Sequence, residues 1–223
     1  MEAAPRSRST STKEKDKIMA ESRNFVIITG GECKTCGIPK GIADGAYVIA
    51  ADSGYDTAVK LGITPDLLVG DMDSIREVPD GVELFRVKAE KEDTDTMLAI
   101  KIAKEKGGEH ITVIGGAGGR ADHWLSNIFM LEALADEGLD VVLIDGINEI
   151  RAVCNGSIRI PNNGGYFGIL ALNDCIITST GCKYPLTEAP LLRAHPYGVS
   201  NEVTDSFAEI NVKGHAIITV SKR

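Results

Sequence analysis

Residues 51–74 read ADSGYDTAVKLGITPDLLVGDMDS, with five aspartates among small and glycine-rich neighbours. Two apolar runs each stop at an acid here, YVIAAD at residues 47–52 and LLVGDMD at residues 67–73. Such short apolar runs predict buried strands of a parallel sheet. Because an open α/β sheet binds ligands at the carboxyl ends of its strands, both runs are expected to bring acids to one crevice.

The second run also predicts a metal site. If residues 67–70 form a strand and the chain stays extended, Asp71 and Asp73 lie on the same side. Two converging carboxylates repel one another unless a cation lies between them, and hard oxygen ligands suit Mg²⁺, which also binds substrate phosphates. The alternative interpretation is a solvated pair of loop acids, which is what most D-x-D triplets are.

Composition limits the class of protein. The chain has 223 residues, of which 43% are hydrophobic and 25% charged, enough for one large domain or two small ones. A net charge of −8 argues against broad binding to nucleic acid or to a membrane surface. Since no apolar run approaches the ~20 residues that span a bilayer and no signal peptide opens the chain, we expect a cytoplasmic protein.

The cysteines are odd in number, which does not fit a secreted disulfide framework, so free thiols are expected. Cys33 and Cys36 form a C-x-x-C that could be half of a zinc site or a redox pair. A closed zinc site needs four ligands, and no second C-x-x-C follows. The five cysteines are Cys33, Cys36, Cys154, Cys175 and Cys182.

Apolar periodicity predicts an α/β first half. Residues 1–22 are polar without an apolar period and are expected to be disordered. A helix should follow residue 53 to about residue 61, and Thr94 should cap another that ends before residue 107. A third helix should follow the glycines at 115–119, with Trp124, Leu125, Ile128, Leu131 and Leu134 near one side. The predicted strands are residues 25–31, 47–52, 67–70, 83–87, 111–114 and 141–146.

The glycine-rich turn GGAGGRAD at residues 115–122 joins a strand to a helix and could hold phosphate on backbone N–H groups. Arg120 would add a planar fork of donors. The turn lacks the G-K-[ST] of a P-loop and a complete G-x-G-x-x-G, so neither named nucleotide motif applies. Asp93 and Asp95 precede and open a helix, where the dipole favours acids even without a ligand.

After residue 147 the helical period disappears and short β-rich runs recur between turn signals. These runs are EIRAVC, SIRI, YFGILAL, CIITST, FAEINV and HAIITV. They predict a small all-β domain, a sandwich or a barrel, after the α/β domain.

The segments ADSGYD, ITPDLLVGDMDSI, EKEDTDT, GGAGGRADHWLSNI, GCKYPL and VSNE, in this order, resemble the thiamine pyrophosphokinase family. The similarity runs from Phe25 nearly to the last residue. It implies a Rossmann-like ATP-binding domain at 23–147, a thiamine-binding β-sandwich at 148–223, and a homodimer with active sites between subunits. It further implies Mg²⁺-dependent transfer of a pyrophosphoryl group from ATP to the hydroxyl of thiamine, giving thiamine diphosphate and AMP.

The resemblance also implies roles for individual residues. The metal ligands would be Asp71, Asp73 and Asp95, and the catalytic set adds Asp122. Tyr184 falls where many members carry a tryptophan that stacks on the thiamine pyrimidine, and tyrosine keeps an aromatic face. The ATP-binding residues would be Asp52, Ser53, Lys91, Asp93, Thr94, Gly116, Arg120, Asp122 and His123. The thiamine-binding residues would be Asp95, Thr178, Tyr184, Ser200 and Asn201.

Two other functions fit parts of the pattern. One is a related diphosphokinase acting on another hydroxymethyl heterocycle, such as a pterin, although the GCKYPL and VSNE segments argue against it. The other is a non-catalytic nucleotide sensor whose acids serve only the fold. Against the sensor, every acid that matches the family's metal site is present in the sequence.

Overall fold

The structure is a computed structural model that describes residues 24–30, 33, 35–71, 81–86 and 93–223. Three predictions fall outside these residues: the disorder of residues 1–22, and the site roles of Asp73 and Lys91.

The first half of the chain forms a parallel sheet, and each strand predicted there is present. Its strands pair in the order β6-β5-β1-β2-β3-β4, all in parallel. Because neighbouring strands run the same way, their carboxyl ends meet along one edge of the sheet. The strands are β1 (Asn24–Ile28), β2 (Tyr47–Ala51), β3 (Leu67–Gly70), β4 (Glu83–Arg86), β5 (His110–Ile114) and β6 (Asp140–Asp145).

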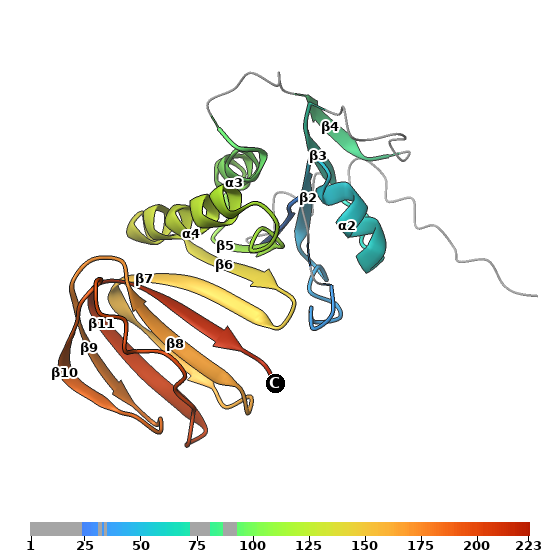
Figure 1. The fold of residues 1–223 in the computed structure, drawn as a ribbon. Helices are drawn as coiled ribbons and strands as arrows, with labels where there is room; N and C mark the ends of the chain where they lie inside the picture. The colour runs from blue at the N-terminus through green and yellow to red at the C-terminus, as the bar shows by residue number, and fades with distance from the viewer. Residues whose placement is uncertain (1–23, 31–32, 34, 72–80, 87–92) are drawn as a thin grey trace, which may run out of the picture.

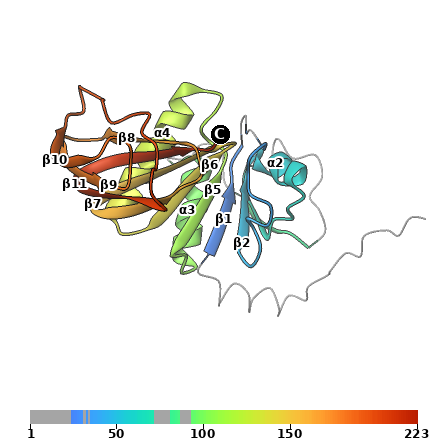
Figure 2. The same ribbon diagram turned by 90° about the horizontal axis from the view of Figure 1, so that it is seen from below.

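Helices cover both faces of this sheet, with α2 opposite α3 and α4 (Figures 1 and 2). Successive side chains of β1 point to opposite faces of the sheet, so each face can pack against its own helices. Phe25 and Ile27 pack in the core that α3 and α4 complete, whereas Val26 and Ile28 pack with Ala58 of α2. The helices are α2 (Gly54–Leu61), α3 (Asp95–Glu105) and α4 (Ala121–Asp136).

The predicted apolar side of α4 is correct in part. Leu131 and Leu134 are buried, but Leu125 is 40% exposed, so it does not share the buried side of the helix with them. The helix instead turns Asn127 inward, where its Nδ2 donates to the carbonyl of Gly116 at 2.9 Å. A buried hydrogen bond to the preceding glycine turn thus contributes to the orientation of the helix, and apolar periodicity does not report it.

The second half of the chain is all β, and one hydrogen-bonded sheet runs through both halves. β7 pairs antiparallel with β6, which gives the order β10-β9-β11-β7-β6-β5-β1-β2-β3-β4, with β8 paired to β11. Its core includes Phe167, Ile177, Ile210 and Ile218. The strands are β7 (Asn148–Pro161), β8 (Tyr166–Ala171), β9 (Cys175–Thr180), β10 (Leu186–Leu191) and β11 (Phe207–Ser221).

Two strands are longer than the sequence pattern predicts. EIRAVC and SIRI join into β7, and FAEINV and HAIITV join into β11. Asn155 and Gly214 interrupt the two patterns with left-handed backbones, φ 48° and 108°, and a bond of 2.9 Å from Gly214 N to Asn155 Oδ1 links them. The register shifts between Val212 and His215, so a bulge stands where separate strands were expected.

The chain is therefore a mixed α/β protein dominated by its sheet. Strand β10, LTEAPL, was not predicted, because its residues lack an apolar run. Among the described residues, no helix is long and apolar enough to cross a membrane.

Candidate active site

A cleft of about 460 Å³ opens where the carboxyl ends of β1 and β2 meet the start of α3 and the glycine turn before α4. This is the edge at which a parallel sheet presents ligands. The described residues that line it are Thr29, Gly30, Ala51, Asp52, Ser53, Asp93, Thr94, Asp95, Thr96, Gly116, Gly118, Gly119, Arg120, His123 and Asn127.

Most of the predicted ATP-binding residues meet in this cleft. Asp71 and Asp122 are not among its described lining, although Asp71 directly follows β3 and Asp122 lies in the first turn of α4. The predicted residues that do line it are Asp52, Ser53, Asp93, Thr94, Asp95, Gly116, Arg120 and His123.

The paired parallel strands β2 and β3 end close to one another. Asp52 takes a left-handed backbone, φ 48°, and its N–H donates to the carbonyl of Val69 at 2.8 Å. A Cβ on Gly70 would lie only 3.3 Å from Cα of Asp52. The absence of a side chain at Gly70 therefore lets the backbone just before Asp71 approach Asp52.

The glycine turn before α4 has a left-handed backbone at three positions. Gly115, Gly116 and Gly119 have φ values of 84°, 78° and 75°, which favour glycine. A Cβ on Gly116 would lie 2.6 Å from Nδ2 of Asn127, the atom that donates to the Gly116 carbonyl. Backbone N–H groups in such a turn, followed by a helix start, can bind an anion.

Arg120 and Asp122 form a two-point ion pair at the cleft mouth. Arg120 Nη2 donates to Asp122 Oδ2 at 2.6 Å, and its Nε donates to Oδ1 at 3.2 Å. This hydrogen bonding holds the pKa of the Asp122 carboxyl below its ordinary value, so the carboxyl is an anion at neutral pH. Asp122 thus orients the guanidinium that lines the cleft.

The start of α3 brings three predicted residues to the cleft. The hydroxyl of Thr94 accepts from the N–H of Met97 at 3.2 Å, which is the predicted cap. Asp93 accepts from Nζ of Lys101 at 2.6 Å, and Asp95 opens the first turn. The Thr94 cap determines where α3 begins, and Asp95 is its first residue, so the cap also determines the position of Asp95.

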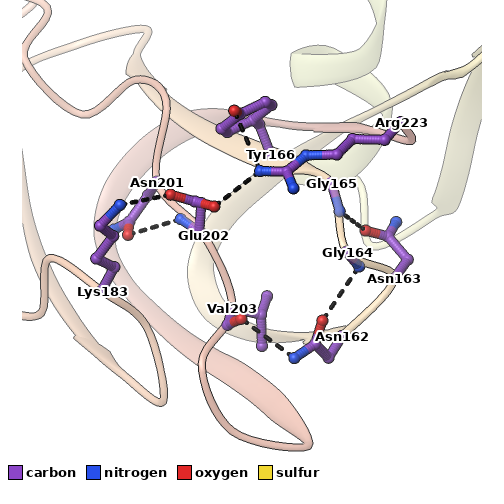
Figure 3. A network of polar contacts seen from close by, with 10 residues as sticks. All are labelled: Asn162, Asn163, Gly164, Gly165, Tyr166, Lys183, Asn201, Glu202, Val203 and Arg223. Atoms are coloured by element: carbon purple, nitrogen blue, oxygen red, sulfur yellow. Dashed lines mark hydrogen bonds and ion pairs between the residues drawn. The ribbon is translucent and has the colours of Figure 1, made fainter.

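Of the five predicted thiamine residues, Asp95 lines the cleft, and the other four lie in the second half of the chain, where Asn201 links two loops. Asn201 is buried, and its Oδ1 accepts from the backbone N–H of Tyr184 at 3.1 Å and of Glu202 at 2.9 Å. Its Nδ2 donates to the carbonyl of Tyr184 at 2.9 Å. Figure 3 shows Asn201 beside Glu202, whose carboxylate also receives Lys183 at 2.7 Å and Arg223 at 2.9 Å.

Asn201 therefore positions the backbone of Tyr184, a residue that is 58% exposed. Ser200 is exposed with φ 59°, and the hydroxyl of Thr178 donates to Glu188 Oε1 at 3.2 Å. None of these residues lines the cleft, because β9 and β10 lie at the far end of the sheet from β2 and β3 (Figure 1). Within one chain, the structure does not bring the two predicted substrate sites together.

Three polar side chains in the cleft were absent from the sequence prediction: Thr29, Thr96 and Asn127. Thr29 is buried and its hydroxyl donates to the carbonyl of Ile114 at 3.2 Å, joining the ends of β1 and β5. Asn127 could have been found from the sequence, since it is a polar residue amid the apolar residues of a helix that follows a glycine turn.

Two family models match the chain in sequence. Residues 39–143 match "Thiamin pyrophosphokinase, catalytic domain", and residues 157–217 match "Thiamin pyrophosphokinase, vitamin B1 binding domain". The thiamine pyrophosphokinase of Bacillus subtilis is 34% identical over 168 residues, covering 71% of this chain and 78% of the relative. A Caenorhabditis elegans thiamin pyrophosphokinase is 29% identical over 155 residues, 64% of each chain.

Solved structures agree with the sequence matches. The crystal structure of the Bacillus subtilis enzyme superposes with a TM-score of 0.79 at 28% identity, covering 90% of this chain and 99% of that one. A thiamin pyrophosphokinase family protein from Enterococcus faecalis gives a TM-score of 0.76 at 29% identity, covering 91% and 100%. The likeness in sequence and fold thus spans both halves of the chain.

Proposed function

The chain belongs to the thiamine pyrophosphokinase family, and from this premise we propose how its residues transfer a pyrophosphoryl group from ATP to thiamine. The family reaction yields thiamine diphosphate and AMP, so the hydroxyl of thiamine attacks the β-phosphorus of ATP. Such a reaction needs positioning and neutralisation of phosphate charge more than covalent work by the protein.

The ATP site is the cleft, and the observation that carries this proposal is its glycine turn beside Arg120. We propose that the N–H groups of residues 115–119 and the Arg120 guanidinium hold the phosphates. Lys91, outside the described residues, is proposed as a further phosphate contact. Asp122 keeps Arg120 oriented, since the pair forms two hydrogen bonds.

The metal site is proposed at Asp71, Asp73 and Asp95, with Mg²⁺ as the ion. The donor set fits, because the described members offer carboxylate oxygens from the end of β3 and the start of α3. Mg²⁺ bound there would neutralise phosphate oxygens as charge develops on them. We propose that Asp95 also accepts the proton of the thiamine hydroxyl.

Thiamine is proposed to bind in the second half of the chain at Thr178, Tyr184, Ser200 and Asn201. The vitamin B1 binding model at residues 157–217 supports this and favours thiamine over a pterin. Because these residues lie far from the cleft of their own chain, we propose a homodimer in which a partner chain supplies them. Light scattering on the purified protein tests this: the mass of two chains is expected, and a monomer that remains active would contradict it.

The finer architecture is part of the same proposal. We propose a Rossmann-like ATP-binding domain at residues 23–147 and a thiamine-binding β-sandwich at 148–223. The division is supported by the family models, which match on either side of it. The unpaired state of all five cysteines supports a cytoplasmic location.

Product analysis tests the reaction. Purified protein with Mg²⁺, ATP and thiamine is expected to form AMP in step with thiamine diphosphate, measured by ion-exchange chromatography. ADP with thiamine monophosphate would instead mean attack at the γ-phosphorus. Binding of ATP without turnover would favour the nucleotide sensor.

Replacement of Asp71 tests the metal site. Asp71→Asn is expected to lower AMP formation by roughly a hundredfold or more, because one carboxylate ligand of the proposed ion becomes neutral. Circular dichroism should be unchanged. Asp56→Asn is the control, since Asp56 is an exposed acid of α2 that is not among the cleft residues. Near-normal activity of Asp71→Asn would remove Asp71 from this role.

A further inference from the structure

Four metal-ligating side chains meet between helix α4 and the second half of the sheet, away from the cleft. Cys154 on β7 and His215 on β11 are direct cross-strand partners. Glu132 and Asp136 are four residues apart on α4, so they lie on one side of the helix. Ligand atoms of Asp136, Cys154 and His215 all lie within 4.8 Å of one another.

The two nitrogens of His215 have different partners. Nδ1 is 2.9 Å from Oε1 of Glu132, and Nε2 is 3.6 Å from Oδ1 of Asp136. In the neutral tautomer that carries its hydrogen on Nδ1 and donates it to Glu132, the lone pair of Nε2 would face Asp136. Metal-binding histidines are commonly oriented in this way by a carboxylate on the other nitrogen.

We propose that Cys154 Sγ, His215 Nε2 and an Asp136 carboxylate oxygen form a zinc site, with Glu132 orienting the histidine. A tetrahedral zinc ion with its usual bond lengths needs ligand atoms about 3.3–3.7 Å apart. The separation of 3.6 Å between His215 Nε2 and Asp136 Oδ1 already meets this, and Cys154 Sγ lies within 4.8 Å of ligand atoms of both. A thiolate, an imidazole and a carboxylate together select Zn²⁺ over Mg²⁺.

The site is accessible and differs from the proposed Mg²⁺ site. Cys154 also lines a cavity of about 690 Å³ beside β7, which gives an ion an entry path. Asp136 is 65% exposed at its side chain, so it can turn toward an ion, whereas His215 is only 20% exposed. With three protein ligands, water would complete the tetrahedron. The ion would tie α4 to β7 and β11.

Cobalt substitution tests the proposal on the full chain. Cys33→Ser/Cys36→Ser serves as the background, because their C-x-x-C could itself bind metal. Titration with Co²⁺ is expected to give one equivalent of tetrahedral cobalt with a thiolate-to-metal charge-transfer band, displaced by Zn²⁺. Cys154→Ser is expected to lose the band, and Asp136→Asn should weaken binding roughly tenfold or more.

Control variants distinguish a metal site from an ion pair between His215 and the two acids of α4. His215→Gln is expected to abolish binding, while His195→Gln, at an exposed histidine, should leave it unchanged. Zn²⁺ should raise the melting temperature of the background protein and not of its Cys154→Ser derivative. Absence of the charge-transfer band in the background protein, or its persistence in Cys154→Ser, would overturn the proposal. Asp136→Asn changes an exposed side chain, so it keeps the test valid if Cys154→Ser fails to fold.

Discussion

At the residue scale, a position can require glycine for two separate reasons, a left-handed backbone and a lack of space for a Cβ. Gly116 has a left-handed backbone, and it also lacks the Cβ that would meet Asn127. Gly138 has a similar φ of 82°, but a Cβ added there would meet nothing within 4 Å. Only the left-handed backbone therefore favours glycine at this position. Comparing the two positions isolates the steric role of Gly116.

Gly116→Ala is expected to destabilise the protein by about 1 kcal/mol more than Gly138→Ala, because it also disturbs the Asn127 hydrogen bond. It should weaken ATP binding, since the glycine turn lies in the cleft. Urea unfolding and ATP titration measure the two effects. Equal losses of stability in the two variants would show that the Asn127 contact is not essential.

The surroundings of Cys33 favour its neutral thiol. Burial, and secondarily the charge of Asp145, raises the pKa of the Cys33 thiol from 9.0 to about 11, while Lys60 opposes the shift. At pH 8 its thiolate population, and so its alkylation rate, should be about a hundredfold lower in the folded protein than in urea. The stability that the neutral thiol contributes is complete below pH 9 and is lost as pH rises toward 11.

Iodoacetamide labelling read out by peptide mass spectrometry checks this for Cys33. The gap between folded and unfolded rates should close as pH approaches 11. Equal labelling of the folded and unfolded chain at pH 8 would contradict the shift.

Residue types and spacing predicted most of the cleft, because acids after strands and glycines before a helix are local signals. Asp52, Thr94 and Arg120 line it as expected. Asn127 and Thr29 were missed because their roles depend on hydrogen bonds to the Gly116 and Ile114 carbonyls, which become neighbours only in the folded chain. The placement of Asp71 away from the described lining was equally beyond local pattern.

At the element scale, α3 links helix capping to the site. Thr94 both caps the helix and lines the cleft, so its hydroxyl stabilises α3 and also fixes where the helix begins beside the cleft. The sequence predicted this cap because a threonine precedes an apolar-periodic run. The sequence pattern wrongly predicted two strands in place of each of β7 and β11. Asn155 and Gly214 break the local pattern, while cross-strand pairing continues past them.

Thr94→Ala is expected to lower the free energy of unfolding by about 1 kcal/mol and to weaken ATP binding, because the N–H of Met97 loses its partner. Thr94→Ser keeps the hydroxyl and should remain close to the original protein. Urea midpoints and ATP titration measure both. If Thr94→Ala matched Thr94→Ser in stability, the cap would not be a stabilising contact.

At the scale of the whole molecule, the two halves share structure. β6 pairs with β7, and Ile217 of β11 belongs to the same core cluster as Leu131 of α4. Sequence patterns predicted that helices give way to strands in the second half, and only strands follow α4 among the described elements. The pairing of β6 with β7 joins the two halves through contacts that periodicity cannot report.

We therefore expect both halves to unfold together. Fluorescence of Trp124, the only tryptophan, reports on α4, and far-UV circular dichroism reports on the whole chain. Their urea midpoints should coincide, as in a two-state transition. Two separated midpoints would show that the halves are energetically independent.

Strand β10 forms the edge of the sheet in the second half of the chain. β10 is the last strand in the sheet order, and its register shifts between Leu186 and Ala189, with Glu188 in a left-handed backbone. Pro190 has no N–H to offer a further strand. A bulged edge with a proline is a poor template for added strands, so this end of the sheet resists edge-to-edge aggregation at high protein concentration.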